Sequence, residues 1–199
     1  MLTYSQVTFK DLRDHFGIRV EAGAFLPAIE PLPLPGWLAE YLSINELTPA
    51  INRSEKAISE TVIAPVLAAV KKHYNGQIGI FSGEPLSGAG LVGICDFIIT
   101  TNPRAYLPEP PIMVLVEAKR QDLLTGIPQC VAEMLAARAV NREAGLDYPA
   151  TYGCVTTGTE WQFLRLVDEL AITDPTILYF DDLERVLGSL AWIINQFTT

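Results

Sequence analysis

The stretch IMVLVEAKR, residues 112–120, decides how the rest of the chain is interpreted. Five apolar residues in succession are typical of a strand buried within a sheet. The run ends in Glu117 and Lys119, and the strand period of two places both side chains on one face. Burying these charges is costly unless they have each other or a third partner. The stretch therefore predicts a buried strand with a functional charge pair at its end.

A second acid lies inside an apolar run. The stretch GICDFII, residues 93–99, places Asp96 in a strand predicted over residues 90–101. Residues 102–111 form a turn-rich loop, so the two strands should pair antiparallel and bring Asp96 and Glu117 within a few ångströms. Two carboxylates that close repel, and a hard divalent cation with oxygen ligands would reconcile them. The pair predicts a site for Mg²⁺, or Mn²⁺ in its place, with one or two ions left open.

A third acid lies on a helix predicted over residues 54–74. Ser54 is a suitable N-cap, and Pro65 should kink the helix. On a helical wheel Glu55 falls near the middle of the apolar arc, while Glu60 falls at its far edge. Glu55 is therefore expected to point inward, with Glu60 as the second choice.

The remaining pattern predicts an α/β fold with a mixed central sheet flanked by helices. Three strands should form an antiparallel meander, and a helix opened by Pro128 should cross over to a parallel strand. This helix places Gln129 in its first turn, and the stretch GEPLSGAG, residues 83–90, is interpreted as a turn. The predicted strands cover residues 76–83, 90–101, 112–119, 150–158, 161–167 and 176–180, and the later helices cover residues 127–142 and 181–197.

The chain is expected to have an N-terminal extension on a single core. Residues 1–50 are interpreted as a helical and loop-rich extension, which packs on a domain of residues 51–199. In the extension, Thr8 is a suitable cap and Gly17 a suitable stop for a first helix. A Pro-rich connector, residues 31–36, leads into a second short helix.

Four features follow one another along the chain: a Glu on a helix, an Asp, a Glu-x-Lys across a hairpin, and a further helix. In this order they resemble the PD-(D/E)XK, or restriction-endonuclease-like, nuclease superfamily. The similar stretch covers residues 54–166. The resemblance implies an α-β-β-β-α-β core and metal-dependent hydrolysis of DNA phosphodiester bonds. It assigns Asp96, Glu117 and Glu55 to the metal, and Lys119 to positioning or deprotonating the attacking water. Gln129 would orient water or phosphate.

Other stretches are similar to a narrower group. The combination of CDFIIT, LVEAKR, GIPQC and YGCVTTGTEWQFL resembles a group of uncharacterised, largely cyanobacterial proteins of the superfamily. The Pro that precedes the first Asp in the motif's name is replaced here by Cys95, which changes no chemical group of the site.

Charge supports a second interpretation. The 199 residues carry a formal charge of −9, which argues against a broad nonspecific grip on nucleic acid. A local cleft or a metal ion could still attract DNA. The alternative is a catalytically inactive member that serves as a binding or regulatory module, either as a homodimer or with a partner protein that brings the nucleic acid.

The cysteines and the apolar runs of the sequence indicate the cellular compartment. Cys95, Cys130 and Cys154 form no C-x-x-C pair, so they predict neither a disulfide framework nor a thiolate zinc site, and they should be small core residues. The N-terminus has no signal-peptide layout, and Pro, Gly or charge interrupts the apolar runs. The expectation is a cytoplasmic protein that does not enter a membrane.

Overall fold

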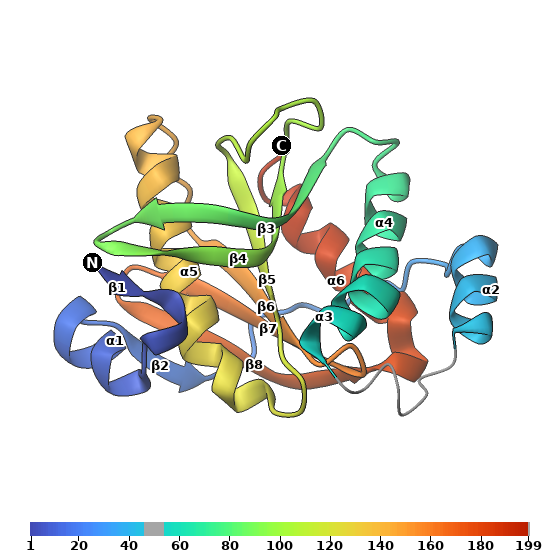
Figure 1. Cartoon of the computed structure of the whole chain (residues 1–199), viewed down its shortest axis with the longest axis horizontal. Helices are drawn as coiled ribbons and strands as arrows, with labels where there is room; N and C mark the ends of the chain where they lie inside the picture. The colour runs from blue at the N-terminus through green and yellow to red at the C-terminus, as the bar shows by residue number, and fades with distance from the viewer. Residues whose placement is uncertain (46–53, 199) are drawn as a thin grey trace.

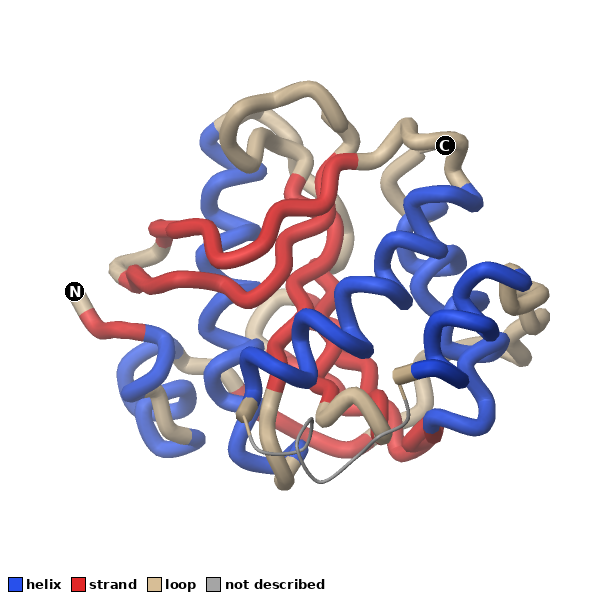
Figure 2. The backbone as a smooth tube through the Cα atoms, turned by 45° about the vertical axis from the view of Figure 1, so that its right-hand side comes forward, coloured by secondary structure: helices blue, strands red, loops and turns tan. Residues whose placement is uncertain are grey.

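An eight-stranded mixed sheet runs through the molecule, with helices on both faces (Figures 1 and 2). The computed structural model describes residues 1–45 and 54–198. The strands are β1 (Leu2–Thr3), β2 (Arg19–Ala22), β3 (Gly79–Gly88), β4 (Leu91–Thr100), β5 (Ile112–Ala118), β6 (Thr151–Thr156), β7 (Glu160–Val167) and β8 (Leu170–Tyr179). The helices are η1 (Tyr4–Gln6), α1 (Phe9–Phe16), α2 (Gly36–Ile44), α3 (Glu55–Ile58), η3 (Ser59–Ile63), α4 (Ala64–His73), α5 (Leu123–Glu143), η4 (Phe180–Asp182) and α6 (Leu183–Asn195).

The strand pairing confirms the predicted meander and parallel crossover. Strands β3, β4 and β5 form an antiparallel meander, and α5 crosses over to β6, which pairs parallel to β5. Strands β7 and β8 continue antiparallel, and β2 closes the far edge parallel to β8. The predicted α/β class with a mixed, helix-flanked sheet is therefore confirmed.

The helices divide into two layers with separate apolar cores. Helices α1 and α5 cover one face, and their core includes Leu115 and Val155. Helices α3, α4 and α6 cover the other face, where the core includes Val116 and Trp161, and α2 packs against α4 (Figure 1). Glu117 pairs with Val155 in the β5–β6 ladder, so its side chain faces the α5 layer.

The crossover helix begins earlier than the sequence predicts. Asp122 is the N-cap of α5, and its side chain accepts a hydrogen bond of 2.9 Å from the Leu124 N–H. The expectation that Pro128 opens the helix is wrong, because Pro128 lies inside it. Gln129 accordingly lies in the second turn, not the first.

Two strands are longer than predicted. Strand β3 continues through most of the GEPLSGAG stretch, and the turn into β4 is Ala89–Gly90, with φ of 52° and 77°. Two successive positive φ angles are typical of the tight turn that matches strand twist. Strand β8 begins at Leu170 because a register shift opposite Gln162 and Leu164 accommodates Pro175.

The helix predicted over residues 54–74 is interrupted by a π-helical turn. Ser54 caps α3 as predicted, accepting from the Ala57 N–H at 3.1 Å. The π turn η3 then widens the helix immediately before Pro65, at the N-terminal end of α4. Pro65 has no N–H to donate to the preceding turn, so the irregularity lies before the proline.

The N-terminal segment contributes to the sheet itself. Thr8 and Gly17 bound α1 as predicted, through a capping box and a left-handed residue with φ of 68°. The sequence pattern did not predict β1 and β2, which pair with β4 and β8 on opposite parts of the sheet. The expected boundary near residue 50 lies outside the described residues.

Helix α5 is the central helix of its layer. Among residues 1–45 and 54–198, it alone is long and apolar enough by composition to cross a bilayer. Within the protein, however, 67% of its apolar window is buried. This burial is what a core helix requires, and it explains why α5 carries so few charges.

Asp174 anchors the segment that follows β2. Its side chain accepts hydrogen bonds from the N–H groups of Phe25, Leu26 and Thr176 at 2.9, 3.0 and 3.0 Å. Burial raises the pKa of this carboxyl group, but the three N–H donors outweigh burial and hold the pKa below its ordinary value. The ionised form of Asp174 therefore stabilises the fold.

Asp174→Ala should lower the free energy of unfolding at pH 7 by about 2 to 3 kcal/mol, because three partly buried N–H groups lose a charged acceptor. Because the pKa of Asp174 is lowered in the folded state, the variant should show its full loss of stability above the ordinary aspartate pKa. This loss should disappear as the pH falls through the lowered pKa of the folded protein. Chemical unfolding from pH 7 to pH 2 measures this. Exposed Asp181→Ala should remain within about 0.5 kcal/mol of wild type; an equal loss in both variants would contradict the assignment.

Candidate active site

The site lies where β4 separates from β5. The two strands pair from Phe97 opposite Val116 onward, whereas the start of β4 pairs with β1 instead. At the point of separation, Asp96 Oδ2 accepts a hydrogen bond of 2.8 Å from the Ala118 N–H. The same register would place Asp96 opposite Glu117. A carboxylate thus takes the place of a strand partner, and it lies beside a second carboxylate.

Glu117 and Lys119 face α5 from the end of β5. Glu117 is 1% exposed, and its Oε1 is paired with the Lys119 ammonium. The same Nζ donates to Gln129 Oε1 at 3.1 Å. Lys119 remains in the sheet ladder, because its N–H donates to the Thr156 carbonyl at 2.8 Å. Both side chains therefore start from a fixed backbone.

Two glycines allow α5 to approach this part of the sheet. A Cβ on Gly126 would lie 2.5 Å from Val155 Cγ1 and 2.9 Å from Lys119 Cγ. A Cβ on Gly153 would lie 2.6 Å from the Cys130 sulfur. The absence of these side chains brings α5 close enough for its polar residues to contact Lys119.

Glu133 is a site residue that the sequence reasoning missed. It is fully buried on α5, and its Oε1 accepts from Gln129 Nε2 at 3.3 Å. Its carboxyl group also lies within hydrogen-bonding reach of Glu117. The available signal was an acid four residues after Gln129 within the apolar run CVAEMLAA, residues 130–137. Asp96 gave the same kind of signal in its strand.

The acids perturb one another strongly. Burial raises the pKa values of Asp96 and Glu117, and repulsion from Asp96 raises that of Glu117 further. The pKa of Glu133 is raised well above its ordinary value, first by burial and then by Glu117. Burial also works against the charged form of Lys119, but Glu117 outweighs it and raises the ammonium pKa. Lys119 is therefore held in its charged form, and burial together with Glu117 favours the neutral form of Glu133.

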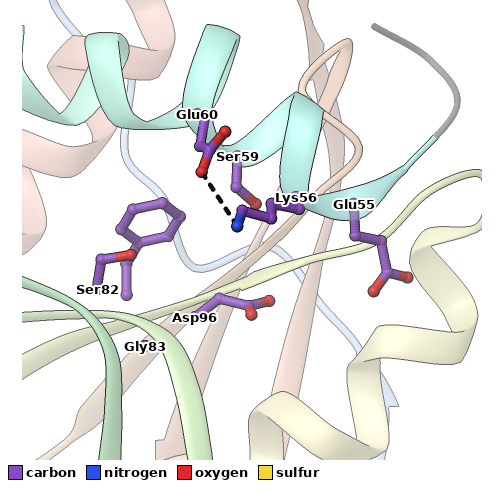
Figure 3. Close-up of a pocket in the computed structure, with 8 residues that line it drawn as sticks. Glu55, Lys56, Ser59, Glu60, Ser82, Gly83 and Asp96 are labelled. Carbon is purple, nitrogen blue, oxygen red and sulfur yellow. Dashed lines mark ion pairs between the residues drawn. The ribbon is translucent and has the colours of Figure 1, made fainter. Parts of the chain in front are cut away.

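Glu55 and Glu60 lie on the wall of an open cleft of about 360 Å³ beside Asp96. Figure 3 shows Glu60 turned toward Lys56, with which it forms an ion pair of 3.8 Å, and Glu55 on the other side of Lys56. Glu55 is exposed within this cleft and is not packed into the core as expected. Its charge raises the pKa values of Asp96 and Lys119. Glu55, rather than Glu60, thus acts on the other site residues.

The acidic side chains suit a hard cation. Glu117 Oε2 is buried without a hydrogen-bond partner, and one oxygen of Asp96 remains beyond its bond to Ala118. Within the described parts of the chain, no three His, Cys, Asp or Glu side chains are already arranged to hold a metal ion. Mg²⁺ is commonly held by one or two protein carboxylates, with water and substrate completing the shell. Asp96 and Glu117 fit that requirement as a pair.

The three cysteines are core residues, as predicted. Cys95, Cys130 and Cys154 are fully buried and form no disulfide. Burial raises all three thiol pKa values, and Glu133 adds to the effect at Cys95 and Cys130. Protonated, buried thiols are inert. Cys95 and Cys130 pack in the core on the α5 side of the sheet, and Cys154 packs in the core on the opposite side.

No protein-family model matches the chain, and no curated protein is significantly similar to it. The site is therefore interpreted from its geometry.

Gly126→Ala tests whether the close approach of α5 maintains the site. The substitution gains up to about 1 kcal/mol of helix propensity, but the new methyl group overlaps Val155 and Lys119, which should cost about 1 to 3 kcal/mol. Thermal unfolding should show net destabilisation, and a crystal structure should show Lys119 displaced from Gln129. Gly36→Ala is the control, because Gly36 also lies in a helix, α2, and no atom lies within 4 Å of its added Cβ. A more stable Gly126→Ala with Lys119 unmoved would refute the packing argument.

Proposed function

We propose that the chain is a metal-dependent nuclease that hydrolyses phosphodiester bonds of DNA on a PD-(D/E)XK, restriction-endonuclease-like core. The observation that carries the proposal is the meeting of Asp96, Glu117 and Lys119 where β4 leaves β5, with a buried carboxylate oxygen left unpartnered. Two repelling acids at a strand fork are expensive to maintain, and a divalent cation would offset that cost.

In this proposal Asp96 and Glu117 hold Mg²⁺ or Mn²⁺, and Glu55 approaches from the cleft side. The bound cation would supply a Lewis acid that polarises a phosphoryl oxygen. Lys119 offsets negative charge that develops on the phosphoryl group, because its raised pKa keeps it cationic. Gln129 holds the Lys119 ammonium in place through its side-chain oxygen.

The cleft beside Asp96 supports access by a substrate. Ser59 and Ser82 line it from η3 and β3, and both can donate hydrogen bonds to phosphate oxygens. Lys56 contributes the cation of this cleft, and it is exposed at the rim. Glycine at position 83 leaves the floor of the cleft open next to Asp96 (Figure 3).

A catalytically inactive binding or regulatory module is the second candidate. It is favoured by the charge of the cleft, where Glu55, Glu60 and Asp96 outnumber Lys56. It is also favoured by the net charge of −9, which would leave DNA contacts to a second copy or a partner protein. Metal binding separates the two candidates, since a module of this kind has no need for the cation.

Titration with Mn²⁺ should raise the melting temperature of the wild-type protein. A ligand that binds only the folded state adds about 2.7 kcal/mol at a hundredfold excess over Kd. Asp96→Asn should abolish the shift, because it removes a charged ligand while retaining an acceptor for the Ala118 N–H. Differential scanning calorimetry with and without Mn²⁺ measures both effects.

Glu55→Gln and Glu60→Gln form a matched pair for the same titration, since both acids line the cleft from one helical segment. Glu55→Gln should weaken the Mn²⁺ shift, whereas Glu60→Gln should leave it unchanged. No shift in wild type, or equal effects in the two variants, would favour the binding-module candidate.

Cleavage of supercoiled, single-stranded and branched DNA in Mg²⁺ should be reduced by about 10² to 10⁴-fold in Lys119→Ala, because a cation next to the developing charge is lost. Lys56→Ala is the control, as it removes a cation from the cleft beside Asp96 without touching Glu117 or Gln129. Gel assays with purified variants measure the rates. Equal cleavage by wild type and Lys119→Ala would indicate a contaminating nuclease or a different site.

A further inference from the structure

We infer that Glu133 is a positioning residue: it closes a ring of side chains that fixes the orientations of Glu117 and Lys119. The consequence for metal binding rests on the function proposed above, whereas the geometry of the ring does not.

The contacts form a closed circuit between β5 and α5. Lys119 Nζ donates to Glu117 Oε1 and to Gln129 Oε1. Gln129 Nε2 donates to Glu133 Oε1 at 3.3 Å, and Glu133 returns to Glu117 through contact between their carboxyl groups. Both acids are at most 1% exposed, so water has little access to either carboxyl group, whereas Lys119 and Gln129 are partly buried.

The directions of the hydrogen bonds assign a role to each member. Lys119 can only donate, so Gln129 must present its oxygen to Lys119 and its amide nitrogen to Glu133. The atoms left over are Glu117 Oε2 and Glu133 Oε2, and both are buried without another partner.

Packing does not account for an acid at position 133. The residue is fully buried among Cys130, Ala136, Ala137 and other apolar residues of α5. Leucine has a similar volume and would fill the same space without the cost of desolvating a carboxyl group. The remaining explanation is the pair of contacts that Glu133 makes, to Gln129 and to Glu117.

Three variants separate positioning from folding. Glu133→Gln keeps a donor for Glu117 and an acceptor for Gln129, so it should preserve the ring. Glu133→Leu removes both contacts at similar volume. Asn141→Leu is the matched control, because Asn141 is also buried on α5 but bonds only to the Ile112 N–H and carbonyl, at 2.7 and 2.9 Å.

Nuclear magnetic resonance of the metal-free protein tests the ring directly. In wild type, Glu133→Gln and Asn141→Leu, the Gln129 amide and Lys119 ammonium hydrogens should exchange slowly with water. In Glu133→Leu both sets should exchange at least tenfold faster, although the backbone amides of α5 remain protected. Unchanged side-chain exchange in Glu133→Leu, or loss of protection in Glu133→Gln, would overturn the inference.

Titration with Mn²⁺ then tests the consequence for the site. Supporting residues behind metal ligands typically account for 10 to 100-fold in affinity, so Glu133→Leu should raise the Kd for Mn²⁺ by at least tenfold. Glu133→Gln should remain within threefold of wild type, and Asn141→Leu should also match wild type despite a lower melting temperature. If the Kd for Mn²⁺ rises equally in Glu133→Leu and Asn141→Leu, Glu133 only supports folding and does not position the site. If the side chains of the wild-type protein are protected from exchange but the protein binds no Mn²⁺, the ring is supported and the proposed nuclease function is contradicted.

Discussion

The hydrogen bond from the Ala118 N–H to the Asp96 carboxylate is the contact on which the site depends. Strands β4 and β5 must separate here, because β1 occupies the same side of β4 a few residues earlier. Separation would leave a strand N–H without a partner in a place where water is scarce. Asp96 supplies the acceptor, and in doing so it is held beside Glu117. The need of the Ala118 N–H for an acceptor thereby brings the two acids together.

The charge balance around this fork explains why so many polar groups gather there. Asp96, Glu117 and Glu55 act on one ammonium group, that of Lys119, while burial and Glu117 favour the neutral form of Glu133. Acids thus outnumber the single ammonium group at the fork, and a bound divalent cation would offset the remaining negative charge. Under the proposed function, the overall acidity of the chain is compatible with a phosphate substrate, because a bound cation would determine the field at the fork more than the distant surface does.

Much of the fold follows from local patterns, and the exceptions have definite physical causes. Apolar runs identified β4, β5 and β6, and the helix between β5 and β6 implied the parallel crossover. The start of α5 was placed late because Pro128 is tolerated inside a helix whose cap, Asp122, lies a turn and a half earlier. Strands β1 and β2 were missed because two to four residues carry no measurable period, and they exist only through pairing with β4 and β8. At the site, residues close in sequence to the motif were identified, whereas Glu133 required knowledge of how α5 lies on the sheet.

Helix α5 joins the stability of the core to the geometry of the site. The same helix fills one apolar layer, presents Gln129 and Glu133 to the acids, and approaches Lys119 through Gly126. A helix on the rim could move and release these contacts at little cost, but one that is two-thirds buried cannot shift without opening the core. The polar ring is therefore held at fixed spacing by apolar packing around it. The placement of buried Glu117 and partly buried Lys119 therefore follows from a helix that the core holds in position.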